Sequence, residues 1–97
     1  MNNEVNDAGN EKLKIYETVL SSPGMGQRCK IILQLSRLNI LLLTRIIEQG
    51  LAVDKKEMKG DILMLLSKEA VEEFRQVIDD ILNKGGLSNF YEKLKSL

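Results

Sequence analysis

Residues 27–50 read QRCKIILQLSRLNILLLTRIIEQG, and the conformation of this stretch decides the fold of the chain. Projected at about 100° per residue, as in an α-helix, its polar and apolar side chains separate. The polar group comprises Lys30, Gln34, Arg37, Thr44, Arg45 and Glu48, and the apolar group comprises Ile31, Ile32, Leu35, Leu38, Leu42, Leu43, Ile46 and Ile47. Because one helix of about six turns explains both groups, we predict a helix over 27–50 that ends at Gly50.

The apolar side of this predicted helix is unusually wide, covering well over half of its circumference. Several other helices must therefore pack around it, which makes it the central helix of the fold. The alternative is a strand over residues 30–35, with Ile31, Leu33 and Leu35 on one face. That strand would leave Ile32 on the polar face, so the helix explains the pattern better.

The chain before this stretch is predicted to contain one short helix. Residues 1–9 are polar and are expected to form a flexible tail, which leaves residues 10–97 as a single helical domain. Asn10 is a suitable N-cap for an amphipathic helix over 11–20. Pro23 lies in the segment 21–26 with two glycines, and this composition predicts a turn.

The chain after this stretch is predicted to form shorter helices. Ser67 is the clearest N-cap, and the helix over 68–84 should end at Gly85-Gly86. Its inner stripe is Val71, Phe74, Ile78, Ile81 and Leu82, with Phe74 and Ile78 in the main core. Asp61 can cap a short helix over 62–66, and Ser88 can cap a last one. We therefore predict an all-α fold, a small bundle of four to five helices.

Composition argues against several classes of function. The chain has 97 residues, 43% of them hydrophobic, and its 14 basic residues balance 14 acidic ones. Whole-chain charge thus provides no attraction to nucleic acid or to an anionic membrane. Histidine is absent and Cys29 is the only cysteine, which removes the commonest general base and any cysteine-clustered metal site. We therefore expect no enzyme, no catalytic residue and no cofactor.

Two charged clusters are interpreted as solvated surface. The acidic residues Glu69, Glu72, Glu73, Asp79 and Asp80 have no histidine to complete a di-metal bundle site. The basic residues Lys55, Lys56 and Lys59 have acidic neighbours and no aromatic side chains on which bases could stack. The N-terminal residues also lack the features of a secretory signal, and residues 31–51 contain too many polar groups for a membrane span, so we expect a cytoplasmic protein.

The function that remains is a protein-interaction module that self-associates through apolar helix faces. The expected partner is a second copy or another protein, and neither nucleic acid, a membrane nor a small-molecule substrate is expected. Asn39 is expected at a helix–helix contact, within one chain or across a dimer, where a buried asparagine can fix register. The candidate interaction residues are Asn39, Leu42, Leu43, Ile46, Phe90 and Tyr91. The alternative is a small nucleic-acid-binding regulator of the ribbon-helix-helix type, with residues 30–35 as the ribbon.

Overall fold

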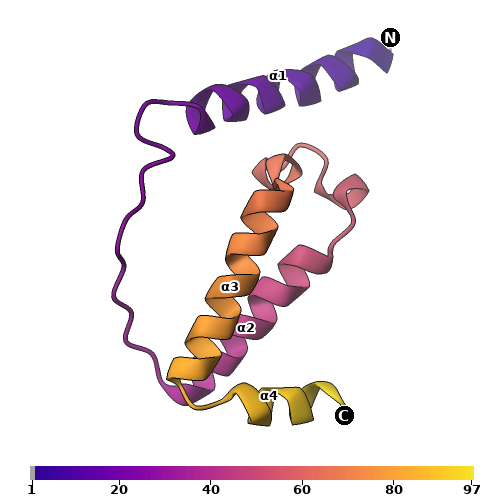
Figure 1. Ribbon diagram of the computed structural model, residues 1–97. Coiled ribbons are helices and arrows are strands. Elements are labelled where there is room, and N and C mark those ends of the chain that lie inside the picture. The colour runs from indigo at the N-terminus through magenta and orange to yellow at the C-terminus, as the bar shows by residue number, and fades with distance from the viewer. Residues whose placement is uncertain (1) are drawn as a thin grey trace. The chain divides into compact units, whose positions relative to one another are not determined.

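A computed structural model describes residues 2–97, and it describes side chains from residue 11 onward. Its elements are the α-helices α1 (Asn2–Leu20), α2 (Arg37–Ala52), α3 (Lys68–Lys84) and α4 (Ser88–Lys95), and the 3₁₀ helices η1 (Lys55–Met58) and η2 (Ile62–Leu65) (Figure 1). No strand occurs within residues 2–97. The predicted all-α fold is therefore confirmed.

The chain divides into two compact units, which are described separately. One unit combines the residues up to Ile31 with Val53–Leu66, and the other combines Ile32–Ala52 with Ser67–Leu97. In the first unit α1 contacts η2, and the one buried hydrophobic side chain among its described residues is Met58. Helix α1 begins at Asn2, so residues 2–9, which were expected as a tail, form its first turns.

The prediction of one long helix over 27–50 is wrong. Helix α2 begins at Arg37 and continues past Gly50 to Ala52, while residues 27–36 are not helical. The cause at the N-terminal end is Ser36, whose Oγ accepts the backbone N–H of Asn39 at 3.0 Å. This bond is that of an N-cap residue, whose own backbone leaves the helix, so the chain before Ser36 takes another course.

Helix α3 agrees with its prediction at both ends. The Oγ of Ser67 accepts the backbone N–H of Ala70 at 3.1 Å, as an N-cap does. After the last helical residue, Gly86 has a φ of +67°, which favours glycine, and the N–H of Leu87 donates to the carbonyl of Leu82 at 2.8 Å. This Schellman arrangement stops α3 and turns the chain into α4.

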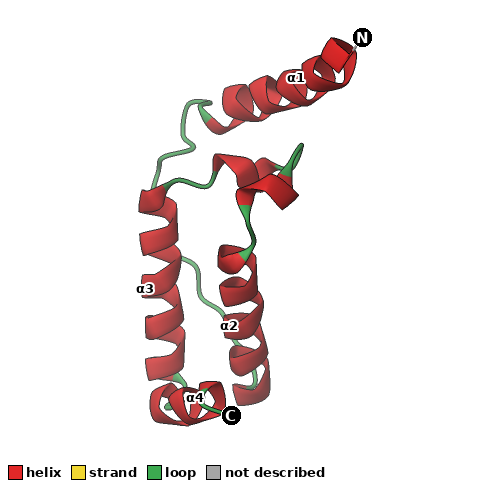
Figure 2. Cartoon of the chain, turned by 90° about the vertical axis from the view of Figure 1, so that its right-hand side faces the viewer, coloured by secondary structure: helices red, strands yellow, loops and turns green. Residues whose placement is uncertain are grey.

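Helices α2 and α3 pack antiparallel in the second unit. The Arg37 Nε, at the start of α2, donates to the carbonyl of Gly85, at the end of α3, at 3.2 Å. A Cβ on Gly85 would lie only 3.1 Å from Cδ1 of Ile40, so glycine allows this close approach. Helix α4 lies at the same end of the pair (Figure 2).

The core of this unit lies where α2, α3 and α4 meet. Its buried side chains are Ile78, Leu82, Leu87 and Tyr91, and Ile40, Leu41 and Ile47 of α2 pack against them. Ile78 is therefore in the core as predicted. Phe74 is not, because its side chain is 40% exposed and lies one turn before the buried part of α3.

Candidate interaction surface

Helix α2 has an inner face that packs on the core. Ile40, Leu41 and Ile47 contribute the apolar contacts of this face, and Thr44 between them is completely buried. Glu48 is half-buried at its end. The inner face thus includes two residues, Thr44 and Glu48, from the polar group of the predicted helix.

The inner position of Thr44 leaves a polar atom without a partner. Its Oγ1 is buried and has no hydrogen bond within the described part of the chain. A buried hydroxyl without a partner costs about 1–3 kcal/mol. The helix adopts this orientation although it buries Thr44, because it places Ile40, Leu41 and Ile47 in the core.

The opposite side of α2 is what we call the outer face, formed by Leu38, Leu42 and Ile46. These residues are four apart, and their side chains are 64%, 51% and 68% exposed. Leu42 precedes Thr44 by two residues, so it points about 160° away from Thr44 around the helix axis. The outer face is therefore an apolar stripe of just over two turns whose side chains stay at least half exposed.

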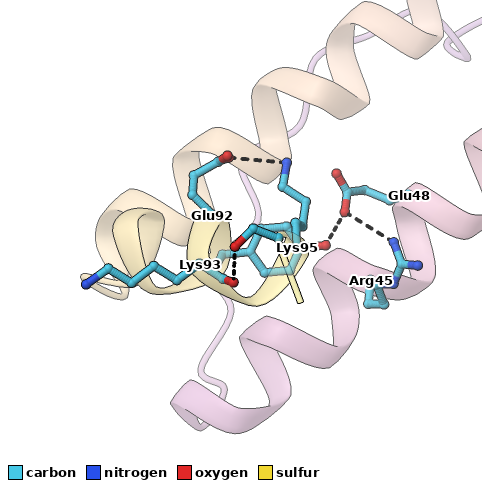
Figure 3. Close-up of polar contacts among 7 residues, drawn as sticks. Arg45, Glu48, Glu92, Lys93 and Lys95 are labelled. Carbon is cyan, nitrogen blue, oxygen red and sulfur yellow. Dashed lines mark hydrogen bonds and ion pairs between the residues drawn. The ribbon is translucent and has the colours of Figure 1, made fainter.

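A polar contact fixes α4 to α2 beside this stripe. The Tyr91 hydroxyl donates to the Glu48 carboxylate, which also lies 3.8 Å from the Arg45 guanidinium. Figure 3 shows this ion pair of α2 next to Lys95 of α4. Burial, and then the hydrogen bond and negative charge of Glu48, raise the pKa of Tyr91, while Arg45 partly opposes the rise.

Helix α4 extends the apolar surface at one end of α2. Phe90 and Leu94 remain exposed, and so does Leu97 beyond the helix. Between α2 and α4 lies an open hollow of about 530 Å³ lined by Leu41, Leu42, Arg45, Tyr91, Leu94, Lys95 and Leu97. Leu42 of the outer face borders this hollow, so the two apolar regions are continuous.

The structure separates the predicted interaction residues into three groups. Leu42 and Ile46 lie on the outer face and Phe90 is exposed on α4. Tyr91 belongs to the core, and Leu43 is half-buried. Asn39 is exposed, so within the chain it is not at a buried helix–helix contact, and its place across a dimer stays a prediction.

The predicted interaction residues omit two side chains that belong to this apolar surface. Leu38 begins the outer face, and Leu94 lines the hollow between α2 and α4. The signal for Leu38 was present in the sequence, because Leu38, Leu42 and Ile46 repeat at the four-residue spacing of one helix face. Leu38 was missed because, unlike Leu42 and Ile46, it was counted with the part of the wide apolar side that packs on other helices.

The segment before α2 is a second apolar surface. The side chains of residues 27–39 are all exposed, and Ile32 reaches 82%. Leu33 and Leu35, with Gln34 between them, line an open hollow of about 490 Å³ with Ile40 of α2 and Ile81 of α3. Two neighbouring stretches of the chain therefore carry large aliphatic side chains that stay in contact with water.

The surface offers apolar contact rather than reactive groups. Within the described residues, no three His, Cys, Asp or Glu side chains gather closely enough to hold a metal ion. None of the described helices has the length and apolar character needed to cross a membrane. Comparison of the chain with protein-family models, curated proteins and solved structures finds no match.

Proposed function

We propose that this protein is a non-enzymatic protein-interaction module of the cytoplasm that self-associates through the outer face of α2. The observation that carries the proposal is the exposure of Leu38, Leu42 and Ile46 along one side of a helix whose other side is already packed. Contiguous apolar stripes of this kind are typical of interaction sites in soluble proteins. Cys29 is a free, exposed thiol, which suits a reducing compartment.

A second copy is a suitable partner for this face. Two stripes meeting about a two-fold axis would bury six aliphatic side chains, and completing their burial contributes roughly 6–10 kcal/mol. Association itself costs about 4–15 kcal/mol in lost freedom of motion. The outer face thus supplies most of what a dimer needs, and a stable dimer requires additional surface.

The test is the molar mass in solution, measured by light scattering over a wide range of micromolar concentrations. The wild-type chain should form dimers as its concentration rises, and Leu42→Glu should remain monomeric because a carboxylate would be buried in the interface. Gln76→Glu is the matched control, since it adds the same charge at an exposed position of α3. A wild-type chain that stays monomeric throughout, or an unaffected Leu42→Glu, would contradict the proposal.

The second candidate function is a nucleic-acid-binding regulator of the ribbon-helix-helix type. It is favoured by one observation, that residues 27–36 are not helical and lead directly into α2, as a ribbon would. The side chain of Arg37, directly after this segment, already donates a hydrogen bond to the Gly85 carbonyl. Within the predicted ribbon, residues 30–35, the basic side chain is Lys30, which is exposed.

Fluorescence anisotropy of a labelled DNA duplex tests this second function. Binding through phosphates should weaken steeply as salt rises, and Lys30→Ala should lower the slope of log K against log salt by about 1 per site. Lys12→Ala, at an exposed position of α1, is the matched control. Absence of binding even at low salt would rule out this function and leave self-association intact.

A further inference from the structure

We propose that residues 31–35 pair with the same residues of a second copy, forming an antiparallel two-stranded ribbon whose two-fold axis passes at Leu33. This inference rests on the self-association proposed above and adds a second contact region to it. The partner of the exposed segment before α2 is then the same segment of a second copy of the chain.

The backbone of the segment is free to pair. From Cys29 to Leu35, no backbone N–H or C=O group bonds to another backbone group among residues 2–97. The same residues include no proline or glycine, so every position keeps its N–H donor and its preference for ordinary strand geometry. The described chain contains no strand that could accept this segment, so in the proposed pairing its partner comes from another molecule.

The side chains of the segment alternate in a way that suits a ribbon packed on helices. Ile31, Leu33 and Leu35 share one face by the two-residue period of a strand. Leu33 and Leu35, together with Gln34 between them, already line the open hollow with Ile40 and Ile81. In the proposed pairing, Ile31 of the second copy lies opposite Leu35 and can enter this hollow.

Charge selects the antiparallel direction. In a parallel, in-register pair, Lys30 would lie beside Lys30 and like charges would repel. Antiparallel pairing about Leu33 places Lys30 opposite Ser36 and Ile32 opposite Gln34, so no cation faces a cation. It also matches Ile31 with Leu35 on the apolar face, so the segment 31–35 pairs with itself over its whole length.

Disulfide cross-linking of the full chain tests both the pairing and its direction. In a Cys29→Ser background, Leu33→Cys places two thiols opposite each other at the two-fold axis, within disulfide reach. Lys30→Cys in the same background is the matched control, because six residues of ribbon, about 20 Å, would separate its thiols. In a glutathione redox buffer, the cross-linked fraction on non-reducing gels should be at least tenfold higher for Leu33→Cys.

Each outcome either supports or overturns the ribbon. Efficient linkage of Leu33→Cys with little linkage of Lys30→Cys supports it, whereas linkage of both variants indicates parallel pairing and overturns it. If neither variant links although light scattering shows that both are dimers, the ribbon is wrong and self-association through α2 stands. If the wild-type chain is a monomer, the proposed function fails together with the ribbon.

Discussion

Helix α3 and the stretch 27–46 are both rich in aliphatic residues, yet one was predicted correctly and the other was not. In α3 these residues follow one stripe, and charged residues occupy the other sides of the helix. In 27–46 they cover well over half of the circumference in helical projection, so the pattern predicts burial without showing which part of this wide side packs on the core. A narrow apolar stripe therefore fixes a helix and its approximate orientation, although Phe74 at the edge of the buried part stays exposed, whereas a wide apolar side leaves both to the available packing partners.

The strongest test of this comparison contrasts a core position with an outer-face position. Leu82→Ala should lower the free energy of unfolding by about 2–5 kcal/mol, because Leu82 is 5% exposed in the core cluster. Leu42→Ala should cost well under 1 kcal/mol in the monomer, since about half of its side chain is already in water. Urea denaturation at low protein concentration measures both, and equal losses would show that the outer face is packed within the chain.

An intermediate effect is expected at the contact between α4 and α2. Tyr91→Phe removes the hydroxyl that donates to Glu48, and it should cost about 1–2 kcal/mol at neutral pH. Circular dichroism during urea denaturation measures this loss. An unchanged stability would mean that Glu48 and water replace the bond without cost.

The same variant should change the pH dependence of stability. The folded state raises the pKa of Tyr91, chiefly through burial, so the neutral phenol is favoured when folded. Its contribution is fully present below the unfolded pKa of about 10 and declines as the pH rises through the folded pKa. Between pH 9 and about pH 11 the wild-type chain should therefore lose more stability than Tyr91→Phe, which carries no ionisable group there. Parallel curves would contradict the raised pKa.

The smallest effect is expected on the inner face of α2, and it has the opposite sign. Thr44→Val replaces a buried hydroxyl that has no partner with a methyl group of similar shape. The melting temperature should rise, with a gain of up to about 1 kcal/mol. Thr18→Val on exposed α1, where the hydroxyl donates to the Lys14 carbonyl at 2.9 Å, is the control in which no gain is expected. A destabilised Thr44→Val would show that Oγ1 has a partner, such as a bound water.

Part of the candidate surface could be predicted from sequence and part could not. Leu42 and Ile46 were identified, because a helix whose apolar side covers well over half of its circumference must offer some of these residues to a second partner. Tyr91 was placed on the same surface, but it lies in the core. Nothing in its spacing distinguishes it from Phe90, and only the way α4 turns after Leu87 sends Tyr91 inward and Phe90 outward.

The sequence by itself determined the all-α class, the absence of histidine chemistry, and both ends of α3, because N-caps, C-terminal glycines and one-sided periodicity act over a few residues. Tertiary structure decided where α2 begins and which of its faces packs. Ser36 can serve in a helix interior or as a cap, and Thr44 can face water or the core. Those choices depend on how well Ile40, Leu41 and Ile47 fit against α3 and α4, which is a property of several helices together.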